Sequence, residues 1–264
     1  MAVQPLLKAA DVSFTYGASA VLDRVSFEIG GSEVVSLLGP SGCGKSTLLN
    51  LIAGFRKPSD GKLLFQGAPI AGPGPDRAVV FQSGALFDWL TARQNIEFSL
   101  SCRGVPKAER REVSERMMTL VGLRGSGDLY PYQMSGGMRQ RVGVARVIAA
   151  RPRIMLMDEP FAAVDVQTRE ALQEELLRIH EATKCAIVFV THSIEEAVFL
   201  SNRVFVLARS GGRIDTEFDV ALPAPRWEPL NRLDPEFLRL RERIYLAMKG
   251  EVPVAGEARV HEFA

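Results

Sequence analysis

The sequence has few of the features that mark secreted, disulfide-bonded or membrane-spanning chains. Its three cysteines, Cys43, Cys102 and Cys185, are scattered without CxxC spacing, which suits a reducing cytosol better than a disulfide framework. No apolar run approaches ~18 residues, the length that a membrane-spanning helix requires. The N-terminus lacks the basic start and the unbroken apolar stretch of a signal peptide. Any role at a membrane therefore requires a partner that crosses it.

The chain also lacks an excess of charge. Its 32 Lys and Arg residues nearly balance 31 Asp and Glu residues, which leaves a formal net charge of +1. This balance argues against a nucleic-acid partner bound through a broad basic surface. A hydrophobic content of 47% and a charged content of 24% are ordinary for a globular protein. The 264 residues can form one large domain or two closely joined subdomains.

Short apolar runs separated by helix-like stretches predict a layered α/β fold. Several runs are apolar on both faces, as are the strands of a buried parallel sheet. The strand candidates are residues 33–39, 62–67, 77–82, 153–160, 185–192 and 203–209, and the helix candidates are 45–55, 167–183 and 194–202. The first thirty residues, which include DVSFTY and RVSFEI, favour an antiparallel β-element at the edge.

The alternation of strand and helix stops between about residues 84 and 151. Residues 105–123 and 136–150 favour helices with no strand between them, which predicts an inserted helical subdomain at about 84–151. We expect the main domain to span 1–220, with the helical subdomain inside it.

A C-terminal extension, partly helical, is expected over residues 221–264. The prolines of ALPAPR, residues 221–226, exclude that segment from a helix interior. Asp234 followed by Pro235 is typical of a helix start, so we predict a helix over 234–250.

The segment GPSGCGKST matches GxxxxGK[ST] and lies between a predicted strand and a predicted helix, where a phosphate-binding loop belongs. Its backbone N–H groups and the helix N-terminus would attract phosphate. Lys45 would reach the β- and γ-phosphates, and the Ser46 hydroxyl would bind Mg²⁺. The flanking elements disfavour the alternative, a glycine turn with a chance lysine. The predicted phosphate-binding residues are Gly39, Pro40, Ser41, Gly42, Cys43, Gly44, Lys45, Ser46 and Thr47.

Polar side chains end several of the predicted strands. Asp158 and Glu159 follow an apolar run, where carboxylates are costly unless they handle a cation or a proton. We therefore expect Asp158 to hold Mg²⁺ and Glu159 to be the base for an attacking water, in preference to a helix cap. Gln82 and His192 end two further strands and should face the same crevice as Lys45. Taken singly, a polar residue at a strand end is usually just solvated or capping, but four such residues at four strand ends favour a shared site.

A second glycine-rich segment, MSGGMRQ at Met134 to Gln140, precedes a basic helix and suggests another anion site. Together with the phosphate loop, Gln82, IMLMDEP, Asp165 and His192, this segment resembles the signature of an ABC-transporter ATP-binding subunit. The resemblance covers residues 11 to about 209. It implies a RecA-like P-loop NTPase core with an antiparallel β edge subdomain and an inserted α-helical subdomain.

The resemblance also implies an ATPase that binds ATP and Mg²⁺. Two copies would form a head-to-tail homodimer with two ATP molecules at the interface. Ser135, Gly136 and Gly137 of one copy would grip the γ-phosphate held by the phosphate loop of the other. The chain departs from the common LSGGQ sequence at Met134 and Met138, but Ser-Gly-Gly is intact, so activity is expected to survive.

The resemblance also assigns roles to single residues. Glu159 would be the catalytic base, and His192 would stabilise the γ-phosphate and the attacking water. Gln82 would sense Mg²⁺ and couple to a membrane partner, and Asp165 would act across the dimer. Tyr16 would stack on adenine, although a half-exposed strand tyrosine is the alternative. The predicted catalytic residues are Glu159, His192, Lys45 and Gln82.

The segment after Gln82 favours a membrane partner. Its apolar residues suggest a groove for another protein's helix, or else packing between subdomains; they are Leu86, Phe87, Trp89 and Leu90. In the family this groove receives a transmembrane permease subunit at the cytoplasmic face of the inner membrane. Together with LPAPR and FLRLRERIYLAM, the segment resembles importers of nitrate, sulfonate and taurine, which also use a periplasmic binding protein. The alternatives are a lipid or export ABC ATPase and an ABC ATPase outside transport.

Overall fold

A computed structural model describes residues 4–81, 85–162, 166–208, 211–250 and 258–260. The chain folds into two compact units. The first unit comprises residues 1–74 and 184–264, and the second unit comprises residues 75–183. The chain therefore leaves the first unit once and returns to it.

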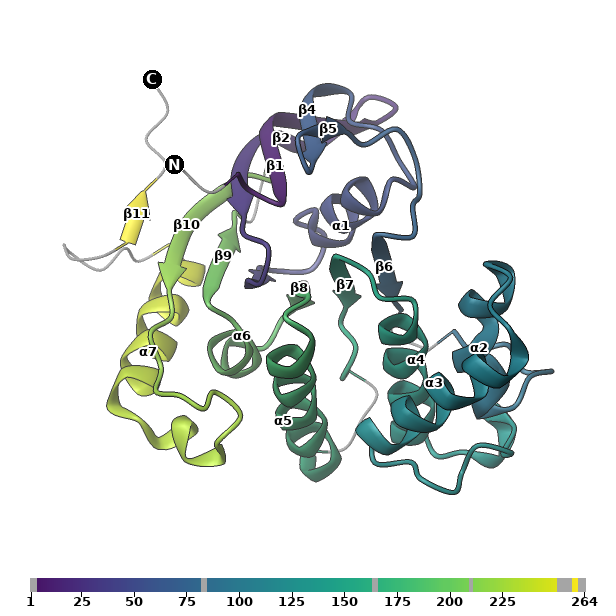
Figure 1. The fold of residues 1–264 in the computed structure, drawn as a ribbon. Coiled ribbons are helices and arrows are strands. Elements are labelled where there is room, and N and C mark those ends of the chain that lie inside the picture. The colour runs from purple at the N-terminus through teal and green to yellow at the C-terminus, as the bar shows by residue number, and fades with distance from the viewer. Residues whose placement is uncertain (1–3, 82–84, 163–165, 209–210, 251–257, 261–264) are drawn as a thin grey trace. The chain divides into compact units, whose positions relative to one another are not determined.

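An antiparallel sheet forms the N-terminal part of the first unit. Its strand order is β2-β1-β4-β5 (Figure 1), with β1 at Leu7–Tyr16, β2 at Ser19–Ile29, β4 at Asp60–Phe65 and β5 at Ala68–Pro69. The buried Leu7 of β1 lies opposite Ile29 on one side and Phe65 on the other. The predicted antiparallel element is therefore present. The apolar run at 62–67 does not join the parallel strands; it contributes β4 here, with Leu63 and Phe65 buried.

Parallel strands form the rest of the first unit's core. Strand β3 lies between β8 and β9 and is parallel to both, and β10 and β11 continue the sheet antiparallel to their neighbours. Their bounds are Val34–Leu38 for β3, Ala186–Thr191 for β8, Arg203–Leu207 for β9, Ile214–Asp219 for β10 and Ala258–Val260 for β11. Every residue of β3 and β8 is buried, as the apolar runs predicted.

Strand β10 was not predicted, because its sequence IDTEFD is polar. Glu217 is nevertheless buried, and it accepts a hydrogen bond from Arg203 of β9 at 2.7 Å. Arg203 also donates to Glu33. Burial opposes the charge of Arg203, but these hydrogen bonds outweigh it and raise the pKa of the guanidinium.

Among its described residues, the first unit also contains three α-helices and a 3-10 helix: α1 at Lys45–Ala53, α6 at Ile194–Leu200, η2 at Pro229–Leu233 and α7 at Pro235–Lys249. The predicted helix start at Asp234 is correct, since its side chain accepts a hydrogen bond from Glu236 N at 2.8 Å. Helix α7 packs against α6, β9 and β10. Arg226, in the proline-rich segment before it, donates to carbonyls at the end of α6, and burial lowers the pKa of Arg226 to about 10.

The second unit combines a parallel strand pair with a group of helices. Strands β6 and β7 pair in parallel, and α2 packs against α3 and α4 (Figure 1). The bounds are Arg77–Val80 for β6, Ala92–Cys102 for α2, Lys107–Leu120 for α3, Pro131–Gln133 for the 3-10 helix η1, Gly136–Ala149 for α4, Ile154–Asp158 for β7 and Val166–Thr183 for α5. Helix α2 was not predicted, although Thr91 and Gln94 form a capping box at its start.

The structure also bears on membrane insertion. Within the described ranges, every helix is too short or too polar to cross a membrane.

Candidate functional site

The phosphate loop connects the end of β3 to the start of α1. Lys45 begins α1, is 6% exposed, and donates from Nζ to the carbonyls of Gly39 at 2.7 Å and Pro40 at 2.8 Å. Gly44 precedes the helix with φ of 101°, and a Cβ there would lie 2.7 Å from Leu22 Cδ2. The loop therefore curls around a buried cation and requires glycine at its last position. Such a loop suits phosphate, because its backbone N–H groups and the start of α1 add positive potential.

The predicted His192 lies at the same sheet edge as the phosphate loop. Strands β3 and β8 are parallel neighbours, and the last residue of each, Leu38 and Thr191, are register partners. The chain thus leaves β3 into Gly39 and leaves β8 into the exposed His192 at one edge of the sheet. For these two segments the prediction from strand ends is correct.

The turn that carries His192 is held by three residues that the sequence analysis did not identify, Thr191, Ser193 and Glu196. Buried Thr191 donates from Oγ1 to Glu196 Oε2 at 2.6 Å and accepts from Ser193 N at 3.0 Å. Ser193 in turn caps α6 by accepting a hydrogen bond from Glu196 N. The sequence signal was present, because Ser193 and Glu196 have the spacing of a capping box.

Tyr16 ends β1 in a partly exposed position. Its ring is 44% exposed, packs edge-to-face on Phe14 with centroids 4.8 Å apart, and has the Arg56 guanidinium 5.1 Å from its centroid. Phe14 therefore supports the ring from within the strand, while Arg56 approaches a ring face. Sequence reasoning did not identify Arg56.

The two predicted acids, Asp158 and Glu159, lie in the second unit. Asp158 ends β7 after four buried apolar residues, and both Asp158 and Glu159 are half-buried. Glu159 has φ of 44°, a left-handed conformation that costs free energy for a residue other than glycine and is common at functional turns. Gln82 and Asp165 lie outside the described residues.

The second glycine-rich segment opens helix α4. Ser135 is its N-cap and accepts a hydrogen bond from Met138 N at 3.3 Å, while Gly136 begins the helix. Ser135 and Gly136 are exposed and Gly137 is half-buried. This exposed helix start presents N–H groups and the positive end of the helix dipole, the features that attract an anion.

The two methionines of this segment differ in burial. Met134 is buried, so it serves the packing of the second unit, and its carbonyl accepts a hydrogen bond from Arg139 Nη1 at 2.7 Å. Met138 is half-buried beside Gly137. The substitution at 138 therefore lies nearer the surface than the one at 134.

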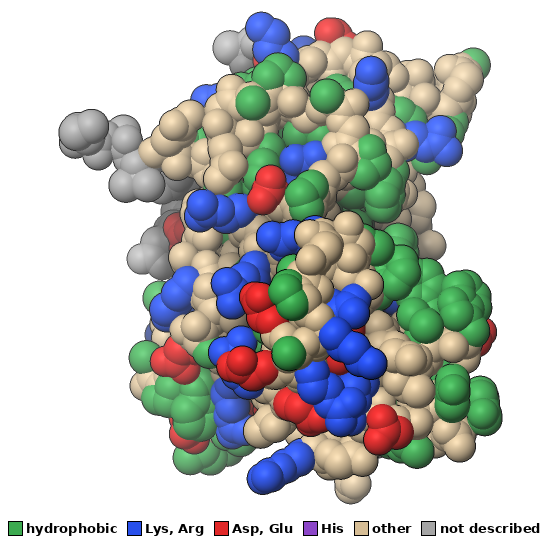
Figure 2. Space-filling view, turned by 45° about the vertical axis from the view of Figure 1, so that its right-hand side comes forward, with side chains coloured by type: hydrophobic (Ala, Val, Ile, Leu, Met, Phe, Trp, Pro, Cys, Tyr) green, Lys and Arg blue, Asp and Glu red, His purple; other side chains and the backbone are tan. Residues whose placement is uncertain are grey.

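The segment before α2 carries exposed aromatic rings. Trp89 is 73% exposed and lies 5.4 Å from the ring of Phe87, which contacts Phe98 at 4.5 Å. Arg146 of α4 lies over Phe87 at 5.5 Å and donates to Ala85 O at 2.9 Å. Figure 2 shows hydrophobic side chains gathered on the right-hand side of the face drawn, among side chains of both charges.

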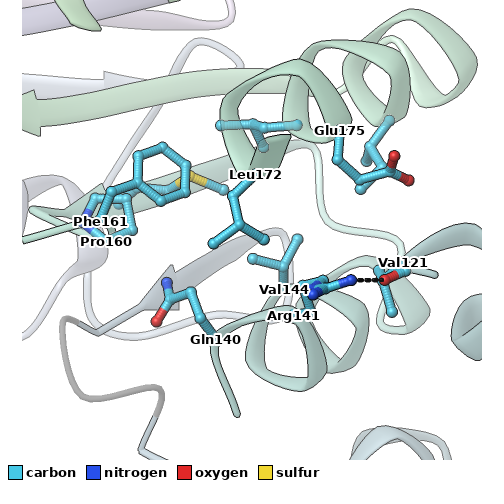
Figure 3. Close-up of a pocket in the computed structure, with 11 residues that line it drawn as sticks. Val121, Gln140, Arg141, Val144, Pro160, Phe161, Leu172 and Glu175 are labelled. Atoms are coloured by element: carbon cyan, nitrogen blue, oxygen red, sulfur yellow. Dashed lines mark hydrogen bonds between the residues drawn. The ribbon is translucent and has the colours of Figure 1, made fainter. Parts of the chain in front are cut away.

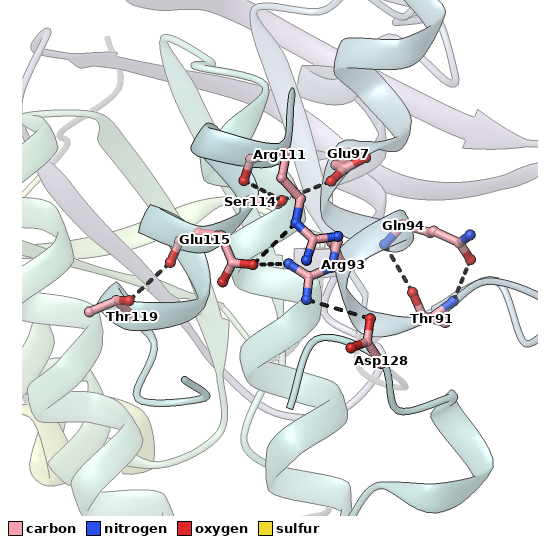
Figure 4. A network of polar contacts seen from close by, with 9 residues as sticks. All are labelled: Thr91, Arg93, Gln94, Glu97, Arg111, Ser114, Glu115, Thr119 and Asp128. Carbon is pink, nitrogen blue, oxygen red and sulfur yellow. Dashed lines mark hydrogen bonds and ion pairs between the residues drawn. The ribbon is translucent and has the colours of Figure 1, made fainter. Parts of the chain in front are cut away.

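This aromatic segment is held rigidly by α2. The fully buried Asn95 accepts a hydrogen bond from Phe87 N and donates to the carbonyls of Phe87 and Leu90. Arg93 pairs with Glu115 of α3 and with Asp128, as Figure 4 shows. Helix α2 therefore links the aromatic segment to the chain that leads into Ser135.

Comparison with known proteins gives a consistent family. The model of the ABC transporter family matches residues 22–162, more than half of the chain. The chain is 46% identical over 245 residues to the taurine import ATP-binding protein of Chromobacterium violaceum, covering 90% of this chain and 94% of that protein. It is 41% identical over 247 residues to the nitrate import ATP-binding protein of Synechocystis, covering 92% of this chain and 93% of that protein.

A solved structure agrees with this assignment. The dimeric post-hydrolysis structure of an ATP-binding cassette bound to ADP and phosphate aligns with a TM-score of 0.70 at 30% identity, over 81% of this chain and 99% of that one. The predicted fold, a P-loop core of the RecA type, is confirmed. The phosphate loop, the relatives and this shared fold agree that the chain belongs to the ABC transporter family, as an ATP-binding subunit that hydrolyses ATP.

Proposed function

We propose that this chain energises an importer of a small solute of the nitrate, sulfonate and taurine kind. The observation that carries the ATPase part is the buried Lys45 inside a glycine loop that shares a sheet edge with His192. Support for import comes from the taurine and nitrate import proteins, which align over more than nine-tenths of their own length. No observation favours an exporter or an ABC ATPase outside transport.

The first unit would bind the nucleotide. The ammonium of Lys45 would turn from the carbonyls of Gly39 and Pro40 toward the β- and γ-phosphates, where the charge-assisted contact is stronger. Backbone N–H groups of residues 39–47 would surround the phosphates. Tyr16 would stack on the adenine, with Phe14 behind it.

The acids after β7 would serve hydrolysis. Glu159 would accept a proton from water as the water oxygen attacks the γ-phosphorus and the bond to the bridging oxygen of ADP breaks. His192 would hydrogen-bond the γ-phosphate and the water. The hydroxyl of Ser46, an exposed residue, and the carboxylate of Asp158 are the hard oxygen ligands that Mg²⁺ prefers, and Gln82 would add an amide oxygen. Bound Mg²⁺ would neutralise charge that develops on the phosphates.

The second glycine-rich segment would complete the nucleotide site of another copy. In a head-to-tail homodimer, Ser135, Gly136 and Gly137 would contact the γ-phosphate held by the partner's phosphate loop, and Asp165 would contact the partner. The exposure of Ser135 and Gly136 at the start of the 14-residue helix α4 supports this assignment.

The aromatic segment would receive the permease at the cytoplasmic face of the inner membrane. The exposed Trp89 and the half-buried Leu86, Phe87 and Leu90 offer an apolar surface, and Asn95 fixes its backbone. Movement of the permease helix would therefore reach Ser135 through the rigid start of α2. A periplasmic binding protein would deliver the solute to the permease.

Replacing Glu159 by Gln tests the catalytic assignment. The variant should lose at least a hundredfold in ATPase rate while it keeps ATP affinity and forms an ATP-dependent dimer, which size-exclusion chromatography detects. Normal turnover by Glu159→Gln would remove Glu159 from its role.

Replacing Ser135 by Arg tests the dimer. We expect the variant to bind nucleotide as a monomer and to form no ATP-dependent dimer, because the long side chain of arginine would block the start of α4. A dimer of unchanged stability would contradict the head-to-tail arrangement.

Uptake measurements test import. Cells that lack this chain should lose uptake of labelled taurine or nitrate and regain it with the wild-type chain, but not with Lys45→Ala. Efflux that depends on the chain, with no effect on uptake, would favour an exporter instead.

A further inference from the structure

A small, partly open cavity lies in the second unit between α4, α5 and the end of β7. Its volume is about 20 Å³, room for one water molecule. Apolar side chains form most of its wall, among them Leu172 and Leu176 of α5 and Val144 of α4. Pro160 and Phe161, the two residues that follow Glu159, also line it (Figure 3).

Two side chains that line this cavity have an unmet hydrogen-bond donor among the described residues: Gln140 at Nε2, and Arg141 at Nε, although another nitrogen of Arg141 donates to Val121 O. Gln140 of α4 is 3% exposed and lines the cavity, as Figure 3 shows. Across the described part of the chain, its Nε2 has no hydrogen-bond acceptor. A buried amide donor without a partner costs free energy, so a packing role alone would be filled better by Met or Leu.

The position of Gln140 connects two parts of the proposed mechanism. Gln140 lies five residues after Ser135 on the same helix, about 7.5 Å along the helix axis. On its other side the cavity reaches the turn after Glu159, whose backbone is held in the left-handed conformation. A shift of α4 at its first turn would therefore move the amide relative to that turn.

We propose that Gln140 is a positioning residue for Glu159. Its Nε2 donates to the backbone of the turn at residues 160–161, directly or through one water in the cavity, when the start of α4 engages a phosphate. The hydrogen bond fixes the turn and holds the Glu159 carboxylate at the attacking water. Binding of the phosphate at the start of α4 would thus give the unmet Nε2 donor of Gln140 its acceptor. This inference rests on the proposed role of Glu159 as the base.

The variant Gln140→Met keeps the length of the side chain and removes the amide. In the full chain, kcat for ATP hydrolysis should fall about tenfold, the value of one hydrogen bond. The KM for ATP should stay within about twofold, because Gln140 is buried at this cavity and is not part of the proposed nucleotide site. The Tm should stay equal to that of the wild type or rise, because the buried unmet donor is gone.

The control is Gln173→Met in α5. Gln173 is as buried as Gln140, at 2% exposure, but it has an interaction partner and is not among the residues with an unmet buried side-chain atom. This variant should lower the Tm and leave kcat within about twofold of the wild type. A Tm that falls in Gln173→Met but does not fall in Gln140→Met would separate the positioning role from a structural one.

Two outcomes for Gln140→Met overturn the inference: an unchanged kcat, or a kcat and a Tm that fall together. The variant Glu159→Gln, measured in the same assay, separates this failure from failure of the proposed function. If Glu159→Gln abolishes turnover and Gln140→Met does not reduce it, only the positioning role is wrong. If Glu159→Gln turns over normally, the base itself is misassigned.

Discussion

The two glycine-rich segments of this chain differ in what makes glycine necessary. At Gly44 the backbone is left-handed, and an added Cβ would lie 2.7 Å from Leu22 Cδ2 and 3.0 Å from Val21 O. At Gly136 the backbone is helical, and among the described residues, outside the backbone of α4, the nearest atom to an added Cβ is Arg139 Nη2 at 4.0 Å. The first glycine is required by the fold of its own unit, and the second is not.

The cations of the two segments differ in the same way. Lys45 is buried inside the first loop, bonded to its carbonyls, so that loop carries its own counter-charge for phosphate. At the second segment Arg139 donates a hydrogen bond to the carbonyl of Met134. The groups that can attract an anion there are the backbone N–H groups at the start of α4 and the helix dipole. A site with a required shape and its own cation binds phosphate alone, whereas the second segment suits a phosphate that is already held elsewhere. This difference supports the proposed head-to-tail dimer.

The largest expected effect is on the first segment. Lys45→Ala should weaken ATP binding at least about a hundredfold, because the charge-assisted contacts to two phosphates are lost. Isothermal titration calorimetry measures the affinity, and Lys62→Ala, an exposed lysine of β4, is the control. Unchanged affinity in Lys45→Ala would show that the loop does not bind phosphate.

Alanine at the two glycines tests the comparison directly. Gly44→Ala should lower the free energy of unfolding by about 2 kcal/mol, from positive φ and the contact with Leu22. Gly136→Ala should raise it by about 0.5 kcal/mol, because alanine favours helix. Urea unfolding measures both values. Equal destabilisation by the two substitutions would show that the fold requires Gly136 as much as it requires Gly44.

For Gly136→Ala the expected effect on ATPase activity is the reverse of its effect on stability. Despite its stability, Gly136→Ala should reduce ATPase activity by about tenfold or more, because the added methyl lies where the partner's phosphate would approach. ATP binding by the monomer, measured by calorimetry, should be unchanged. Full activity would indicate that no group approaches Gly136 closely.

A smaller effect is expected at the His192 turn. Thr191→Val removes the hydrogen bonds to Glu196 and Ser193, which should cost about 1–2 kcal/mol of stability and lower kcat a few-fold as His192 shifts. Thr216→Val, a buried threonine of β10, should leave kcat unchanged. An equal loss of kcat in both variants would mean that Thr191 acts only through stability.

The smallest effect is expected at Met138. Met138→Gln restores the polar residue of the common signature. The hydrogen bond from Met138 N to Ser135 Oγ should be kept, because its donor is a backbone N–H group. We expect kcat to change by less than about threefold, upward if the amide reaches the partner's nucleotide. Steady-state ATPase assays measure it, and a larger loss would show that Met138 packs in a way that glutamine cannot.

Much of the fold was predictable because its signals are local. Apolar runs located β3, β7, β8 and β9, and Asp234 with Pro235 located the start of α7. Elements whose stability comes from distant contacts were missed. In strand β10 the buried Glu217 is paired with Arg203 of the neighbouring strand. In α2 the side chain of Arg93 forms ion pairs with Glu115 of α3 and with Asp128.

The candidate site shows the same limit. Glycine spacing identified the phosphate loop, and the end of a strand identified His192, whereas Thr191, Arg56 and Gln140 carry no local signal of their roles. Each matters through a side chain or cavity that the fold brings to it. The roles of Gln82 and Asp165 stay predictions.

By itself the sequence determined the family, the phosphate loop and the positions of most apolar strands along the chain, because each depends on spacing along the chain. Tertiary structure decided which glycine the fold requires, since Gly44 meets Leu22 only after β2 and α1 have packed. It also decided that Leu38 and Thr191 end side by side, which places the phosphate loop and His192 at one edge. Gln140 is buried with its Nε2 lacking an acceptor among the described residues, which is likewise a product of packing between helices that no spacing along the chain records.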